Sequence, residues 1–138
     1  MPPDYKAKLS STLEDLQALL VAMRTFLEEK SIPNKTIKEA ELVTEELISN
    51  TIKYGYMQSS DGTIEVTVHP QKDLLLIRIE DHAPAFDPTS HPKPNTSKPI
   101  YTRSIGGMGI ELVRKITQSF DYARSNGHNR ITLTIPYA

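Results

Sequence analysis

Two polar side chains spaced one helical turn apart are of types that can do chemistry. Glu46 and Asn50 lie in the stretch 41–56, ELVTEELISNTIKYGY. In a helix, residues four apart stack on the same side. A carboxylate there can take a proton from an attacking hydroxyl or water, and an Asn oxygen suits Mg²⁺ that also binds phosphates and water. Such pairs are also common on solvated helix surfaces, so the spacing alone leaves both interpretations open.

Two further clusters follow in the chain. Asp81 ends an apolar run that begins at Leu74, and a carboxylate at a strand end can accept a hydrogen bond from the exocyclic amine of a base. The run GGMG at 106–109 precedes a helical pattern. Backbone N–H groups at a helix N-terminus bind phosphates, and glycine allows their close approach. Alone, Asp81 could start a turn and the glycines could be a tight helix entry; no Walker-type Gly-Lys-Ser/Thr follows. Together and in this order, the clusters indicate a nucleotide site.

Helices and strands must position these residues, and the sequence pattern predicts where each begins and ends. Apolar spacing predicts one helix from Ser11 to about Lys30, begun by a capping box of Ser11 and Glu14. A second helix, from Asn34 or Thr36 to near Gly55, carries Glu46 and Asn50. Its apolar arc comprises Ile37, Ala40, Val43, Leu47, Ile48, Thr51, Ile52 and Tyr54.

Alternating apolar residues predict strands at 5–9, 63–69, 74–80, 120–125 and around 131–135, and a third helix runs from 106 to about 118. Asn126 and Gly127 mark a hairpin turn. Helices are grouped rather than alternating strictly with strands. We therefore expect an α+β fold, a two-layer sandwich with helices on one face of a mixed, mostly antiparallel sheet.

The segment 81–105 holds five of the ten prolines. Long loops inside compact domains are usually functional or disordered, and we interpret about 84–106 as a lid rather than a passive linker.

Composition narrows the function classes. A chain of 138 residues suggests one domain, 1–138. The net charge of −1 offers no basic excess for nucleic acid, and the absence of cysteine excludes disulfides and thiolate chemistry. No run has the length of a membrane span, and the start does not resemble a signal peptide, so we expect a cytoplasmic protein without membrane contact. The four histidines show no metal-ligand spacing.

The three clusters resemble the motifs of the GHKL (histidine-kinase-like ATPase) superfamily. Residues 46–56, ELISNTIKYGY, are similar to the N-box of these ATP-binding domains. Residues 81–88, DHAPAFDP, resemble the first glycine box of the small stand-alone branch, the anti-sigma factor serine kinases of bacterial partner-switching modules. Residues 103–115, RSIGGMGIELVRK, resemble its second glycine box. The likeness extends over essentially the whole chain.

The resemblance implies an ATP-dependent serine/threonine-protein kinase with ATP and Mg²⁺ as cofactors. It would phosphorylate an anti-anti-sigma antagonist, bind a sigma factor or similar client, and form a homodimer. Glu46 would be the general base, Asn50 the Mg²⁺ ligand and Asp81 the partner of the adenine amine. Arg103 would neutralise phosphate charge or touch the partner. Further residues expected at the nucleotide are Ala83, Gly106, Gly107, Met108 and Gly109. Lys53, three residues after Asn50, either reaches a phosphate or is a solvated helix lysine.

Three positions depart from the family pattern. Ala83 stands where glycine is usual, Tyr54 where histidine is common, and His128-Asn129 where a Gly-Thr pair often begins the final strand. A non-catalytic, nucleotide-dependent protein-binding switch therefore stays open. The catalytic part of a two-component histidine kinase is a third possibility. It would need a phosphoacceptor from another chain, because the helix at 11–30 contains no histidine.

Overall fold

A computed structural model describes residues 4–90 and 107–138 of the chain. The elements, in chain order, are β1 (Tyr5–Ser10), α1 (Leu13–Glu29), α2 (Asn34–Asn50), the π-helical turn η1 (Thr51–Gly55), β2 (Thr63–Pro70), β3 (Leu74–Asp81), the 3₁₀ turn η2 (Pro88–Ser90), α3 (Gly107–Ile116), β4 (Ser119–Ser125) and β5 (His128–Pro136).

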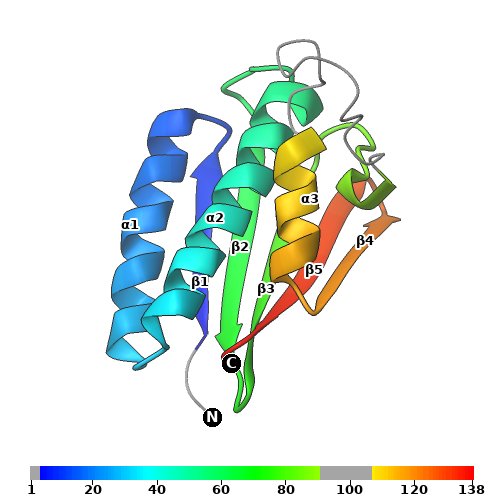
Figure 1. Cartoon of the computed structure of the whole chain (residues 1–138). Helices are drawn as coiled ribbons and strands as arrows, with labels where there is room; N and C mark the ends of the chain where they lie inside the picture. Colours follow the sequence, from blue (N-terminus) through cyan, green and yellow to red (C-terminus); the bar gives the residue numbers. More distant parts are fainter. Residues whose placement is uncertain (1–3, 91–106) are drawn as a thin grey trace.

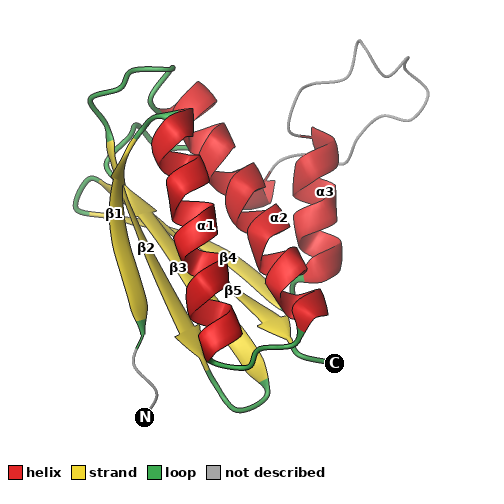
Figure 2. Cartoon of the chain, turned by 90° about the vertical axis from the view of Figure 1, so that its left-hand side faces the viewer, coloured by secondary structure: helices red, strands yellow, loops and turns green. Residues whose placement is uncertain are grey.

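The strands form one sheet in the order β1-β2-β3-β5-β4. Helices α1, α2 and α3 lie side by side on one face of this sheet (Figures 1 and 2). The predicted α+β two-layer sandwich is therefore confirmed. Each neighbouring pair of described strands is antiparallel, so the sheet in this part of the chain lacks the parallel pairing that a mixed sheet contains.

The core lies between the two layers. In β3, the alternate residues Leu75, Ile77 and Ile79 are at most 1% exposed and face the helices. Leu47 and Ile48 of α2 are buried to the same degree. Burying each such side chain contributes about 1.5–3 kcal/mol, so the apolar face of α2 is held firmly while its edge carries the polar pair.

The start of α1 differs from the predicted capping box. Thr12, not Ser11, caps the helix, and its Oγ1 accepts a hydrogen bond from Asp15 N at 3.2 Å. Ser11 is 2% exposed and holds the loop before β2 instead, donating to Ser59 O and accepting from Gly62 N. The buried Ser11 hydroxyl needs these bonds, since an unpaired buried polar group is costly.

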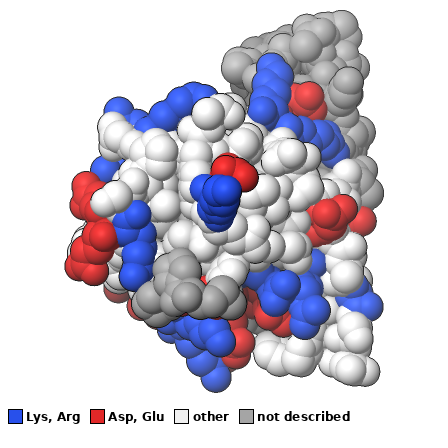
Figure 3. Space-filling model, turned by 90° about the horizontal axis from the view of Figure 1, so that it is seen from below, with Lys and Arg blue, Asp and Glu red and all other residues white. Residues whose placement is uncertain are grey.

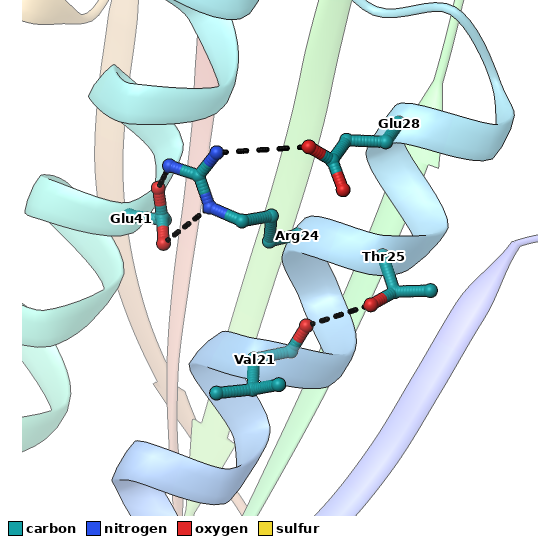
Figure 4. A network of polar contacts seen from close by, with 5 residues as sticks. All are labelled: Val21, Arg24, Thr25, Glu28 and Glu41. Carbon is teal, nitrogen blue, oxygen red and sulfur yellow. Dashed lines mark hydrogen bonds and ion pairs between the residues drawn. The ribbon is translucent and has the colours of Figure 1, made fainter.

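An arginine links α1 to α2 at the surface. Arg24 Nε donates to Glu41 Oε2 at 3.2 Å and its Nη2 donates to Glu41 Oε1, while Nη1 lies 3.8 Å from Glu28. Figure 4 shows this fork between the helices, with Thr25 Oγ1 donating to Val21 O on the same helix. The two-pronged contact fixes how the helices sit against each other along their length.

The end of α2 changes from an α-helix to a π-helical turn. Regular α-helix stops at Asn50, and Tyr56 N donates to Thr51 O, five residues back, at 2.8 Å. Tyr54, predicted on the apolar arc, is 42% exposed, and its ring lies 6.2 Å from the Phe86 ring. That expectation is wrong because a π turn takes more residues per turn, which rotates later side chains off the α-helical arc.

The β4–β5 turn sets the register at the far edge of the sheet. Asn126 and Gly127 both have positive φ, 53° and 77°, as a type I′ hairpin turn requires. This turn pairs Asn129 with Arg124, and β5 in turn pairs Asn129 with Asp81.

Of the predicted lid, only residues 84–90 are described; 91–106 lie outside the described residues. Among the described helices, none is long and apolar enough to cross a membrane. On the face seen from below, positive and negative side chains are interspersed rather than gathered into a field of one sign (Figure 3).

Candidate nucleotide site

Three chain segments that are distant in sequence meet at the upper end of the molecule in Figure 1. They are the C-terminal end of α2, the end of β3 and the beginning of α3. These segments carry Glu46 and Asn50, Asp81, and Gly109 respectively. The clusters that the sequence predicted to act together thus lie at one end of the fold.

Glu46 and Asn50 are hydrogen-bonded to each other at the edge of the core. Asn50 is 4% exposed and its Nδ2 donates to Glu46 Oε1 at 3.2 Å. A Cβ added at Gly109 would overlap the carboxylate of Glu46. The first turn of α3 therefore lies directly on this carboxylate, and a side chain at 109 would displace the carboxylate from its present position.

Asp81 is a buried carboxylate at the end of β3, 5% exposed. Its Oδ1 accepts hydrogen bonds from Asn129 Nδ2 at 2.8 Å and from Ala83 N at 2.9 Å. The second bond shows that Asp81 also starts a turn, the alternative that its position in the sequence allowed. Among the residues that the structure describes, none donates a hydrogen bond to Oδ2, so this oxygen of the carboxylate is available to a ligand.

Burial governs the ionisation of this carboxyl. Removal from water raises the pKa of Asp81 above its usual range, because the charged form is disfavoured in an apolar surrounding. The hydrogen bonds from Asn129 and Ala83 N, and the charges of His82 and Arg124, oppose the shift without cancelling it.

Ala83, which replaces the expected glycine, fits without strain. It is 1% exposed, and its backbone is not among the residues with positive φ. A Cβ at Gly55 would stand 3.2 Å from the Ala83 methyl. The methyl group thus occupies the space left by Gly55, so the glycine missing from one segment is matched by a glycine in the other.

Tyr56 ties the end of α2 to the chain after Asp81. Its hydroxyl donates to Thr63 O at 2.7 Å and accepts from His82 N at 2.9 Å. Burial raises the pKa of this phenol, so it keeps its proton and can donate at neutral pH. The two strand ends and the π turn are held together by this one hydroxyl group.

The sequence missed a polar network beside Asp81. Asn129, 2% exposed, donates through Nδ2 also to Ala83 O and Pro84 O, each at 3.1 Å. Its Oδ1 accepts from Arg124 Nη1 at 2.9 Å and from the Tyr122 hydroxyl. The only signal in the sequence was that Asn129 departs from the family pattern. His82 and His128, taken as scattered, have ring centroids 4.1 Å apart, edge to face.

For the other predicted residues, the structure describes only some positions. Lys53 is exposed on the π turn. Gly107 and Met108 form the start of α3, whereas Arg103 and Gly106 lie outside the described residues.

The residues present suit a Mg²⁺–nucleotide. Because Asn50 Nδ2 is engaged by Glu46, its Oδ1 is the atom left for a hard cation. Gly109 keeps the α3 backbone close to the pair, and Asp81 Oδ2 can accept from an amine. A hollow of about 810 Å³ lies at the opposite end of the molecule, between the α1–α2 connection, the β2–β3 turn and Tyr137. None of the predicted site residues lines it.

The sequence profile of the histidine kinase-like ATPase domain matches residues 9–135. The chain belongs to this family. The match includes every described residue of the site.

Relatives with described activities are similar to this chain at low identity. Serine/threonine-protein kinase BtrW of Bordetella bronchiseptica is 26% identical over 93 residues, covering 67% of this chain and 66% of the relative. Serine-protein kinase RsbW of Listeria innocua is 24% identical over 86 residues, covering 59% and 55%. The matched part is thus less than two thirds of the length of either relative.

A solved structure supports the fold. The crystal structure of the RsbU and RsbW domains of a Mycobacterium tuberculosis protein has a TM-score of 0.70 at 14% identity, covering 98% of this chain and 32% of that chain.

Proposed function

We propose that this chain is an ATP-dependent serine/threonine-protein kinase that acts as an anti-sigma regulatory factor. It phosphorylates an anti-anti-sigma antagonist and binds a sigma factor or a similar client. The proposal rests chiefly on the Glu46–Asn50 pair beneath the start of α3, in a chain of the histidine kinase-like ATPase family. The relatives named as serine kinases support the type of acceptor.

The proposed reaction is in-line transfer of the γ-phosphoryl group. Glu46 takes the proton of the acceptor hydroxyl as its oxygen attacks the γ-phosphorus, and the bond to the β-phosphate oxygen breaks to release ADP. Asn50 Oδ1 holds Mg²⁺, which neutralises phosphate charge when bound. Because Asn50 Nδ2 donates to Glu46, the base and the metal ligand keep a fixed separation, which favours an in-line geometry.

The other predicted residues are proposed to bind the adenine and the phosphates of ATP. Asp81 accepts from the adenine amine, beside Ala83. The start of α3, with Gly107, Met108 and Gly109, binds the phosphates through backbone N–H groups, together with Gly106, which precedes the helix in the sequence. Lys53 and Arg103 add positive charge, and the segment 84–106 acts as the lid.

The partner is found by capture from cell extract with and without MgATP, followed by mapping of phosphorylated residues. We expect a small antagonist protein that carries phosphoserine or phosphothreonine only in the MgATP sample. Light scattering on the purified chain measures the proposed homodimer.

A nucleotide-dependent binding switch is the second candidate. It is favoured by the contact of Glu46 with Gly109, which can serve helix packing without any chemistry. Capture that depends on nucleotide but leaves the partner unphosphorylated supports the switch and contradicts the kinase.

A further inference from the structure

Asn129 is saturated with hydrogen bonds in a buried position. Its Nδ2 lies 2.8 Å from Asp81 Oδ1 and 3.1 Å from both Ala83 O and Pro84 O. Its Oδ1 accepts from Arg124 Nη1 and the Tyr122 hydroxyl. The Asn129 NH₂ group therefore faces acceptors, and its oxygen faces donors.

These partners fix the orientation of the amide. A guanidinium can only donate, and carbonyl oxygens can only accept. Turning the Asn129 amide over would place its NH₂ against the Arg124 N–H and its oxygen against the two carbonyls and a carboxylate. Arg124 Nη1 also donates to Ala83 O at 2.9 Å, so the guanidinium ties β4 directly to the chain after Asp81.

The fixed amide in turn fixes the carboxylate of Asp81. Oδ1 receives two donors, from Asn129 Nδ2 and Ala83 N. The bond plane of the carboxyl is thereby set, and Oδ2 is presented as an acceptor. An acceptor at this place matches the 6-amino group of adenine and opposes the 6-oxo group of guanine or hypoxanthine.

We propose that Asn129, oriented by Arg124, is a specificity-determining positioning residue that holds Asp81 so that its free oxygen selects a 6-amino purine over a 6-oxo purine. The proposal rests on the nucleotide binding proposed above. It adds a residue that touches no substrate and acts through Asp81.

The experiment compares binding of ATP and inosine triphosphate to wild type, Asn129→Leu and Asn129→Thr by calorimetry. Leu has a similar volume and no donor, so affinity for ATP should fall about tenfold, the effect of one hydrogen bond to a charged group. Affinity for inosine triphosphate should change little, so the preference for ATP collapses. Thr keeps one donor for Asp81 and should retain most of the preference. Arg124→Met should behave like Asn129→Leu.

The matched control is Arg130→Met, because Arg130 follows Asn129 on β5. Arg130 is paired with Glu80, and its side chain is 53% exposed, so the preference should be unchanged. A merely structural role of Asn129 predicts equal losses for the two nucleotides. An undiminished preference for ATP in Asn129→Leu overturns this inference alone, whereas a wild type that binds neither nucleotide overturns the proposed function and the selectivity with it.

A second measurement needs no nucleotide and serves if Asn129→Leu proves unstable. In the folded Asn129→Thr protein and in Arg124→Met, the carboxyl pKa of Asp81 is followed by carbon NMR. The Asn129 bond and the Arg124 charge both lower this pKa. Arg124→Met, which removes the charge and frees the amide, should therefore raise it by both routes, and Asn129→Thr, which keeps the charge and one donor, should raise it less. A pKa unmoved in Arg124→Met contradicts the positioning.

Discussion

Asp81 is subject to opposite demands from stability and recognition. The side chain is 5% exposed, and burial raises its pKa against the opposing hydrogen bonds. An ionised carboxylate at this place costs more folding free energy than an uncharged amide of the same shape. Only the carboxylate, however, offers acceptors alone to an amine.

Asp81→Asn should therefore stabilise the nucleotide-free protein at neutral pH and weaken ATP binding. A carboxyl with a raised folded pKa contributes stability that is fully present below its usual value of 3.8 and is lost as pH rises through the folded pKa. The variant does not titrate, so its advantage over wild type should grow with pH through that window. Urea unfolding between pH 4 and 7 measures the difference.

Asp61→Asn provides the control, because Asp61 is an exposed carboxylate in the loop before β2. A difference between Asp81→Asn and wild type that shrinks as pH rises would show that the ionised form of Asp81 is not the strained one.

At the scale of elements, α2 and α3 meet where Glu46 faces Gly109. A Cβ there has three nearest neighbours, all atoms of the Glu46 carboxylate. Helix α3 carries its own apolar face, with Ile110 and Val113 each 1% exposed. That face fixes the helix on the core, so added volume at 109 is relieved by the flexible Glu46 side chain, whose carboxylate has to leave Asn50 Nδ2.

The effect of Gly109→Ala on the free energy of unfolding should have opposite signs with Glu46 and with Ala at position 46. In wild type the added methyl displaces the carboxylate and leaves the buried Asn50 Nδ2 without this acceptor, which should destabilise the fold by roughly 1–2 kcal/mol. In Glu46→Ala the overlap is gone, and Ala in a helix is favoured over Gly by roughly 0.5–1 kcal/mol, so the same change should stabilise. A thermal double-mutant cycle measures the coupling. Equal effects in the two backgrounds would mean that α3 does not rest on Glu46.

The apolar pattern of the sequence predicts the helices and strands well, but it does not predict the π turn or the cap of α1. Period-two and helical patterns placed the three α-helices and five strands of the described residues, because burial of one face determines both. Tyr54 was misplaced because nothing local distinguishes a π turn from a continued α-helix. The cap on α1 moved from Ser11 to Thr12 because Ser11 is needed by a loop whose contact with it is not local in sequence.

At the scale of the whole molecule, strand order brings the site together. Asp81 and Asn129 are 48 residues apart and become direct partners only because β5 lies between β3 and β4. A sequence motif predicts the Asp81 carboxylate but not its cross-strand partner, since pairing depends on the topology of the sheet. The Tyr122 and Arg124 contacts were missed for the same reason.

Binding of MgATP across these elements should stabilise the domain as a unit. At a free concentration 100 times the dissociation constant, the gain is about 2.7 kcal/mol, seen as a raised melting temperature. Asn50→Ala should lose most of this gain. Ser49→Ala is the control, because within the described part of the chain its hydroxyl bonds to Glu46 O alone, at 3.1 Å. A full MgATP shift in Asn50→Ala would contradict the metal-ligand role.

The account is tested most directly by the initial rate of phosphoryl transfer from MgATP to the captured antagonist. Glu46→Gln keeps an acceptor for Asn50 Nδ2 and the volume beneath α3, but it cannot take a proton. We predict a rate at least about 100-fold below wild type, with ATP binding retained and with Glu45→Gln, an exposed neighbour, unaffected. Transfer by Glu46→Gln at the wild-type rate would contradict the assignment of the base.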